Sequence, residues 1–202
     1  DPRKLALSRM DASLRIVLVD ENSERSDELE QALVACGYTV LARLGGRDDL
    51  RARIAALAPD VIIVDMASPD RDVLEDMRRI HSDKPRPVVM FVGESDSDSI
   101  RAAVRAGVSA YVVDGLKARS VAPIVEVAIA RFEAFQALRG ELATTREQLE
   151  DRKFVERAKG ILMRRRGLSE DDAYRLLRKT AMDRKLRLGE IARQLVSLED
   201  LI

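Results

Sequence analysis

The sequence predicts a doubly wound α/β domain followed by a long helix and a small helical bundle. Short runs rich in Val and Ile alternate with amphipathic stretches up to about residue 118. Continuous apolar strands separated by helices are typical of a parallel sheet buried on both faces. From residue 119 onward the strand-like runs stop and only helical spacing continues. A change in net charge accompanies this change in pattern.

Five strand units account for the first domain, residues 13–118. The predicted strands cover residues 14–20, 38–43, 60–65, 86–92 and 110–114, and the predicted helices cover 24–37, 47–58, 72–80 and 97–107. Leu29 and Leu33 share one face of the first helix, which Gly37 is expected to end. Five such strands in about 105 residues favour a flavodoxin-like sheet. In that architecture ligands lie beyond the carboxyl ends of the strands.

Residues 119–151 are predicted to form a long linker helix. Its apolar residues are Ile124, Ala128, Phe135, Leu138, Leu142 and Leu149, and they follow alternating steps of three and four once Arg131 and Thr145 are counted as polar interruptions. Such a seam favours a coiled coil and therefore a dimer. A single amphipathic helix packed on its own domain is the alternative interpretation.

Residues 152–198 are predicted to form a bundle of three short helices. The first covers about 152–166 and ends near Gly167, Ser169 begins the second, and "LGEIARQLV" is the third. Their apolar faces can interlock around a small core. Residues 1–12 lack both patterns and are expected to be a tag or tail outside the fold.

Charge divides the chain at the same place. Lys plus Arg and Asp plus Glu both total 35, so the whole chain is neutral. Residues 13–117 contain 14 basic and 19 acidic side chains, a net charge of −5, whereas residues 152–193 contain 14 and 6, a net charge of +8. Such an excess predicts that the second region binds a polyanion, although solvated helix faces are the simpler alternative.

Other features of the composition exclude several protein classes. A single cysteine, Cys36, excludes an intrachain disulfide, and its apolar neighbours predict a buried thiol in a reducing compartment. No apolar run reaches the roughly 18 residues of a membrane span. The single histidine, His81, is expected in a surface loop without a nucleophile beside it. We therefore expect a cytoplasmic protein that is not an enzyme.

Three carboxylates are predicted to meet at one edge of the sheet. Asp20 and Glu21 end the first strand and Asp65 ends the third, and these strands are neighbours in a doubly wound sheet. Carboxylates held this close repel one another unless a cation compensates their charge. Mg²⁺ is therefore a candidate ligand of Asp20, Glu21 and Asp65, although no cofactor is required by the sequence.

This arrangement resembles the receiver domain of two-component response regulators. The resemblance covers residues 14–117 and depends mainly on "DMASP" and "AGVSAYVVDGL". It implies that Asp20 and Glu21 hold Mg²⁺ and that Asp65 occupies the position of the phosphate-accepting aspartate.

Two positions depart from the pattern of that family. The fourth strand ends in Val92 where the family has a hydroxyl, and the fifth ends in Asp114 where the family has a lysine. Phosphoryl transfer requires charge neutralisation around three oxygens, and Asp114 would instead repel a phosphoaspartate. The sequence thus favours Asp65 as a relic of the fold or part of a protein-docking surface. Phosphorylation by a histidine kinase is the alternative.

Helical spacing gathers basic side chains on the first helix of the predicted bundle. Lys153, Arg157, Gly160 and Arg164 share one side of it, which we call the basic lane, and Lys159 and Arg166 border the other side. A glycine in a helix interior costs about 1 kcal/mol relative to alanine. Gly160 therefore indicates a close approach, either by a bound polyanion or by a neighbouring helix.

The same region resembles the ANTAR domain, a three-helix RNA-binding module of bacterial antitermination regulators. "ERAKGIL", "AYRLLR" and "AM" occur in order, at the expected distances, within residues 152–196. The pieces "PRPVVMF", "GVSAYVVDG" and "IARFEAFQALR" further resemble the nitrate-assimilation branch of ANTAR response regulators.

The resemblance implies a function in transcription antitermination. A homodimer joined by the coiled coil would bind paired hairpins in leader RNA, and a nitrate/nitrite-sensing partner protein would hold the regulator inactive. The candidate RNA contacts are Lys153, Arg157, Lys159, Gly160, Arg164, Arg165 and Tyr174. A DNA-binding transcription factor is the alternative from another class.

Overall fold

The structure is a computed structural model that describes residues 13–20, 23–45, 49–68, 71–113 and 120–199. It divides into two compact units, residues 1–135 and residues 136–202, and each is treated by itself. Helix α6 (Val121–Arg166) contributes residues to both units. No helix in these described ranges is long and apolar enough to cross a membrane.

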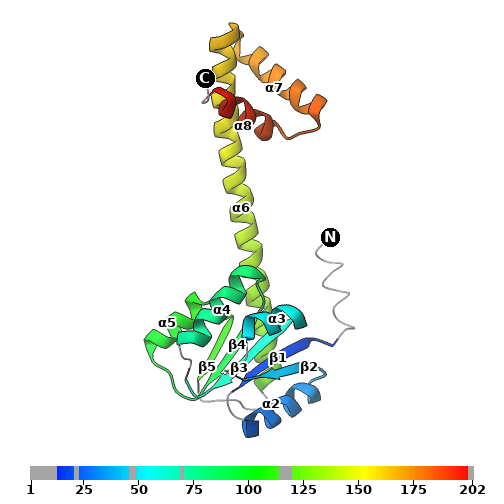
Figure 1. Ribbon diagram of the computed structural model, residues 1–202, viewed down its shortest axis with the longest axis vertical. Coiled ribbons are helices and arrows are strands. Elements are labelled where there is room, and N and C mark those ends of the chain that lie inside the picture. The colour runs from blue at the N-terminus through cyan, green and yellow to red at the C-terminus, as the bar shows by residue number, and fades with distance from the viewer. Residues whose placement is uncertain (1–12, 21–22, 46–48, 69–70, 114–119, 200–202) are drawn as a thin grey trace. The chain divides into compact units, whose positions relative to one another are not determined.

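Five parallel strands form the sheet of the first unit (Figure 1). They are β1 (Arg15–Asp20), β2 (Thr39–Leu44), β3 (Val61–Met66), β4 (Val88–Val92) and β5 (Ala110–Val113). Their order is β2-β1-β3-β4-β5, and every neighbouring pair is parallel. The predicted doubly wound sheet is therefore confirmed.

Helices cover both faces of this sheet (Figure 1). Helix α2 (Ser23–Ala35) and the first turns of α6 pack on one face, and α3 (Leu50–Leu57), α4 (Arg71–Asp83) and α5 (Ser97–Arg105) pack on the other. Successive strand residues point to opposite faces, so the central strands supply both cores. All six residues of β3 are buried, as its continuous apolar run predicts.

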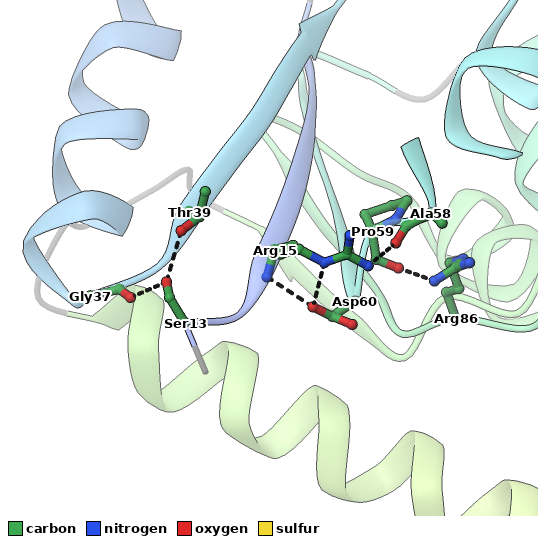
Figure 2. Close-up of polar contacts among 8 residues, drawn as sticks. All are labelled: Ser13, Arg15, Gly37, Thr39, Ala58, Pro59, Asp60 and Arg86. Atoms are coloured by element: carbon green, nitrogen blue, oxygen red, sulfur yellow. Dashed lines mark hydrogen bonds and ion pairs between the residues drawn. The ribbon is translucent and has the colours of Figure 1, made fainter. Parts of the chain in front are cut away.

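Two arginines make hydrogen bonds at the amino end of the sheet (Figure 2). The backbone N–H of Arg15 donates to the Asp60 carboxylate at 3.0 Å, and the Arg15 guanidinium donates to the Ala58 carbonyl. The Arg86 guanidinium donates to the Pro59 carbonyl. These bonds hold the segment between α3 and β3 against the start of β1, at the end of the sheet opposite to Asp20.

The second unit is a helical bundle around a small core. Helices α7 (Glu170–Arg184) and α8 (Leu188–Glu199) pack with the last turns of α6. Ala158, Leu177 and Ala192 are among the buried side chains at their junction. Gly167, with φ +65°, ends α6, and the Ser169 hydroxyl caps α7 by accepting the N–H of Asp172 at 3.1 Å, as predicted.

Helix α6 differs from the two separate helices that the sequence predicted around residue 152. One helix of 46 residues runs through both regions, because no proline follows its first turn. Ala128 is fully buried in the core of the first unit, so this part packs on its own domain. Leu138, Leu142 and Leu149, by contrast, are 62%, 51% and 56% exposed.

Two side chains lie elsewhere than the sequence predicted. Cys36 is exposed, not buried, because Leu29 and Leu33 occupy the inner face of α2 and Cys36 follows the end of that helix. His81 lies within α4, not in a loop. Its ring meets that of Phe132 edge to face, with the centroids 6.4 Å apart.

Substitution by alanine is expected to change the stability in opposite directions at two glycines. Gly107 has φ +91°, and a Cβ there would lie 2.5 Å from His81 Cγ, so Gly107→Ala should lower the free energy of unfolding by more than about 1 kcal/mol. Gly140 is exposed within α6, and a Cβ there would meet no described atom within 4 Å. Gly140→Ala should therefore raise stability by about 0.5–1 kcal/mol. Denaturant unfolding measures both, and shifts of the same sign would contradict this account.

Candidate functional site

The carboxyl edge of the sheet brings Asp20 and Asp65 together. They are direct partners in the pairing of β1 with β3, and they are 9% and 1% exposed. Neighbouring carboxylates are oxygen ligands of the kind that Mg²⁺ prefers. Glu21 lies outside the described residues, and the described ranges contain no group of three metal-ligating side chains. The Mg²⁺ site therefore stays a prediction in which Asp20 and Asp65 would supply two ligands.

Val92 occupies the place where the receiver pattern has a hydroxyl. It ends β4 beside Met66 and is fully buried. A valine neither donates nor accepts a hydrogen bond, so it cannot contact a phosphoryl oxygen on Asp65 as a hydroxyl does. The next hydroxyl along the chain, that of Ser95, is hydrogen-bonded to the Tyr111 hydroxyl at 2.7 Å. Asp114 lies outside the described residues.

The basic lane lies on an exposed side of α6. Lys153, Arg157 and Arg164 are all exposed. A Cβ at Gly160 would meet, among the described atoms, only the Arg164 guanidinium at 3.5 Å, which is an ordinary contact. No neighbouring helix in the described ranges approaches Gly160, so this lane is open to a ligand.

Lys159 lies apart from the basic lane and differs in role from the sequence-based expectation. Its side chain is buried, and its ammonium group pairs with Glu156 at 2.8 Å and Glu170 at 2.7 Å. Hydrogen bonds to Glu156 and then Glu170 raise the pKa of Lys159, and the bond from Lys159 lowers the pKa of Glu170. Because two carboxylates already compensate its charge, Lys159 joins α6 to α7 instead of facing a ligand.

Three ion pairs join α6 to α8 (Leu188–Glu199) and to Arg187, the residue just before it. They are Glu147–Arg187 at 3.0 Å, Asp151–Arg193 at 2.7 Å and Glu199–Arg165 at 3.0 Å. Arg165, a predicted RNA contact, therefore has a carboxylate partner although it is exposed. Tyr174 on α7 is 42% exposed, so its ring is available for stacking.

The close helix approach that the sequence suggested at Gly160 occurs instead at Gly189. A Cβ at Gly189 would overlap the Asp151 carboxylate, which holds Arg193, and the Arg193 guanidinium lies 5.4 Å from the centroid of the Phe154 ring. Gly189 thus lets the start of α8 lie directly against α6. The glycine at the second position of the predicted helix was the available signal for this contact.

Several exposed cations of the second unit have no carboxylate partner within the described ranges. They are Lys153, Arg164, Arg166, Arg178, Lys179, Arg184 and Lys185. Their charges are not compensated by ion pairs and are available to a polyanion.

Comparison with known proteins assigns both units. Residues 16–125 match the response regulator receiver domain, and residues 143–196 match the ANTAR domain. Over 178 residues the chain is 33% identical to the transcriptional regulatory protein PdtaR of Mycobacterium tuberculosis, which covers 88% of this chain and 87% of PdtaR. The chain belongs to the ANTAR response regulators. Its predicted family is thereby confirmed, and both matched families are regulatory, not enzymatic.

Further similarities are confined to parts of this ANTAR response regulator. The nitrate regulatory protein of Klebsiella oxytoca is 46% identical over 66 residues, which are 33% of this chain and 17% of that protein. The receiver domain of a modulated diguanylate cyclase from Desulfovibrio desulfuricans has a TM-score of 0.54 at 20% identity, covering 61% of this chain and 98% of that domain. A CheY-like receiver from Methanospirillum hungatei has the same score and coverage at 22% identity. At these identities the structures show a shared fold alone.

Acetyl phosphate tests whether Asp65 accepts phosphate. Because Val92 offers no hydroxyl, we expect incubation with acetyl phosphate and Mg²⁺ to leave the intact mass unchanged. Val92→Thr combined with Asp114→Lys, which together supply the missing hydroxyl and cation, is the matched variant for restoring labelling. A stable gain of one phosphoryl group by the unmodified protein, lost in Asp65→Asn, would contradict this prediction and favour control by a histidine kinase.

Proposed function

We propose that this ANTAR response regulator is a cytoplasmic transcription antitermination factor that binds hairpins in leader RNA. The observation that carries the proposal is the ANTAR match at residues 143–196, which contains residues 152–193 with their net charge of +8 and the exposed basic lane. Exposed cations supply the sequence-independent part of nucleic-acid affinity. Binding would keep a terminator hairpin from forming, so that the polymerase continues.

The exposed part of the basic lane is suited to phosphate contacts. Lys153, Arg157 and Arg164 recur along one side of α6 at helical spacing, with open surface at Gly160 between them. Phosphate contacts position an RNA without reading its sequence, whereas unpaired loop bases carry the sequence information. We infer that the lane orients the hairpin and that exposed side chains such as Tyr174 contact its bases.

The exposed leucines of α6 support a homodimer. Leu138, Leu142 and Leu149, with Thr145 between the last two, fall on the a and d positions of a continuous heptad pattern. A contiguous apolar stripe of this kind is costly in water and is covered when a second copy supplies the same stripe. Two copies would present two ANTAR domains to two hairpins, which increases the overall affinity if the hairpin spacing fits.

Charges beside the stripe favour a parallel dimer. Arg139, Arg146 and Lys153 follow one flank, and Glu141 lies on the other. In a parallel, in-register pair, Glu141 of each copy faces Arg146 of the other. An antiparallel pair would instead place the basic flanks of the two copies against each other.

We also propose that the receiver domain is controlled by a protein partner, such as a nitrate/nitrite sensor. Two observations support this. Buried Val92 stands where a phosphate-sensing hydroxyl would be needed. The similarity over 66 residues to a nitrate regulatory protein favours a role in nitrate assimilation. The partner would sequester the regulator and release it when nitrate or nitrite binds to the sensor.

Removing two cations from the basic lane tests the RNA-binding proposal. The probe is an RNA hairpin selected on the full-length protein from a library with a randomised loop. Arg157→Ala with Arg164→Ala should weaken binding and reduce the slope of log K against log salt by up to about 1.5. Arg78→Ala with Arg79→Ala removes the same charge from the receiver and is the control. An unchanged affinity and slope would contradict the proposal, as would equal binding of duplex DNA at physiological salt.

Analytical ultracentrifugation tests the dimer. Leu142→Asp should raise the dimer dissociation constant at least tenfold, because each copy loses a buried leucine and gains a charge. Ala143→Asp, one residue away on the outer side of α6, should leave it unchanged. In a parallel dimer Glu141→Lys should weaken association and adding Arg146→Glu should restore it. A dimer that tolerates Leu142→Asp would show that another surface is used.

A further inference from the structure

A groove opens among α6, α7 and α8 in the second unit. Its volume is about 280 Å³. The floor is formed by Leu162, Leu177 and Ile191, which are 7%, 3% and 5% exposed. Leu198 stands at the mouth and is 60% exposed. The groove is therefore an apolar slot that no described residue fills.

Two uncharged polar side chains, Thr180 and Gln194, lie among the apolar residues that line this groove. The Thr180 hydroxyl donates to the Leu176 carbonyl at 2.8 Å, so its lone pairs remain available as acceptors. The Gln194 side chain is exposed, and its amide offers both a donor and an acceptor. A planar ring with a polar edge matches this combination, since its faces are apolar and its edge requires donors and acceptors.

Arg166 and Arg184 form a cationic rim around the groove. Both are exposed, and neither takes part in an ion pair with another described residue. Arg165, between Arg164 and Arg166, is by contrast held by Glu199. The rim therefore presents two positive charges beside an apolar slot.

The C-terminal end of α6 connects the basic lane with this groove. Successive helical side chains are about 100° apart. Arg164 consequently extends the lane, whereas Arg166 points to a different side of the helix and borders the groove. A single RNA strand that follows the lane would have to pass around the end of α6 to reach the groove, because Arg164 and Arg166 are about 200° apart around the helix.

We propose that the groove binds one unpaired base of the RNA loop, with Arg166 and Arg184 contacting the phosphates on either side of it. The inference deepens the proposed function and rests on RNA binding by this unit. The basic lane contributes cations but no apolar slot, so it positions the RNA without selecting bases. The groove supplies the selection through the edge contacts of Gln194 and Thr180.

A loop-resolved binding experiment tests the groove on the full-length protein. The probe is the selected hairpin described above, together with versions in which each loop nucleotide in turn is abasic. Gln194→Ala should weaken binding of the intact hairpin three- to tenfold, as expected for one lost hydrogen bond. At one loop position, an abasic nucleotide should weaken binding to the unmodified protein. On that abasic hairpin, Gln194→Ala should cause no further loss of affinity. Arg178→Ala, an exposed cation of α7 outside the groove, should keep the full difference between intact and abasic loops.

Two further variants make the test decisive. Leu198→Glu places a negative charge at the mouth and should reduce affinity at least tenfold, with circular dichroism and thermal unfolding confirming the fold. Arg184→Ala should reduce the salt slope by about 0.7, the value for one phosphate of a single strand.

The possible failures are distinguishable. If Gln194→Ala and Leu198→Glu keep both the affinity and the preference for intact loops, the groove is not a base site, although RNA binding stands. A change in sedimentation with unchanged RNA affinity would show that the groove is a protein interface and would also overturn the inference. If the unmodified protein selects no hairpin at all, the proposed function and this inference fail together.

Discussion

The continuity of α6 is the constraint on which the rest of this protein depends. A helix fixes the angle between its side chains, so residue spacing alone determines which of them face the same way. Ala128 completes the core of the first unit, and Ala158 lies at the centre of the second. Between them, Asp151 pairs with Arg193 of α8 and Glu147 with Arg187 just before it, both on one side of α6, while the exposed leucines lie on the opposite side. Dimerisation through those leucines would therefore leave the contacts of α8 undisturbed.

Charge compensation separates structural cations from candidate ligand-binding cations in the basic unit. Lys159 and Arg165 are used to attach α7 and α8 to α6, and their charges are balanced by glutamates. Lys153 and Arg164 lie on the same helix but have no such partner in the described ranges. Arg165, Arg187 and Arg193 pair with carboxylates outside residues 152–193, so the net charge of +8 counted there overstates the charge offered to a polyanion. The groove below Arg166 adds what charge cannot supply, namely an apolar slot of limited size.

The first unit has the receiver fold but lacks the hydroxyl that the receiver pattern places at the position of Val92. Asp20 and Asp65 are brought together by the pairing of β1 with β3, which the buried core enforces whether or not a phosphate ever arrives. Val92 fits the same core as an apolar strand end. The sheet therefore preserves the acidic edge for reasons of folding, and that edge by itself is not proof of phosphoryl transfer. A regulator of this construction can be controlled through contacts on its surface.

The sequence by itself determined the elements whose signal is local. Apolar runs predicted all five strands, Gly37 and Gly167 marked helix ends, and family motifs identified the receiver and the ANTAR domain. Only the tertiary structure decided which cations are compensated, that Gly189 and not Gly160 admits a neighbouring helix, and that Cys36 is exposed. It also showed one continuous α6 where two helices were expected. The physical reason is that strands and caps depend on neighbours in the chain, whereas ion pairs, burial and helix approach depend on residues brought together by folding.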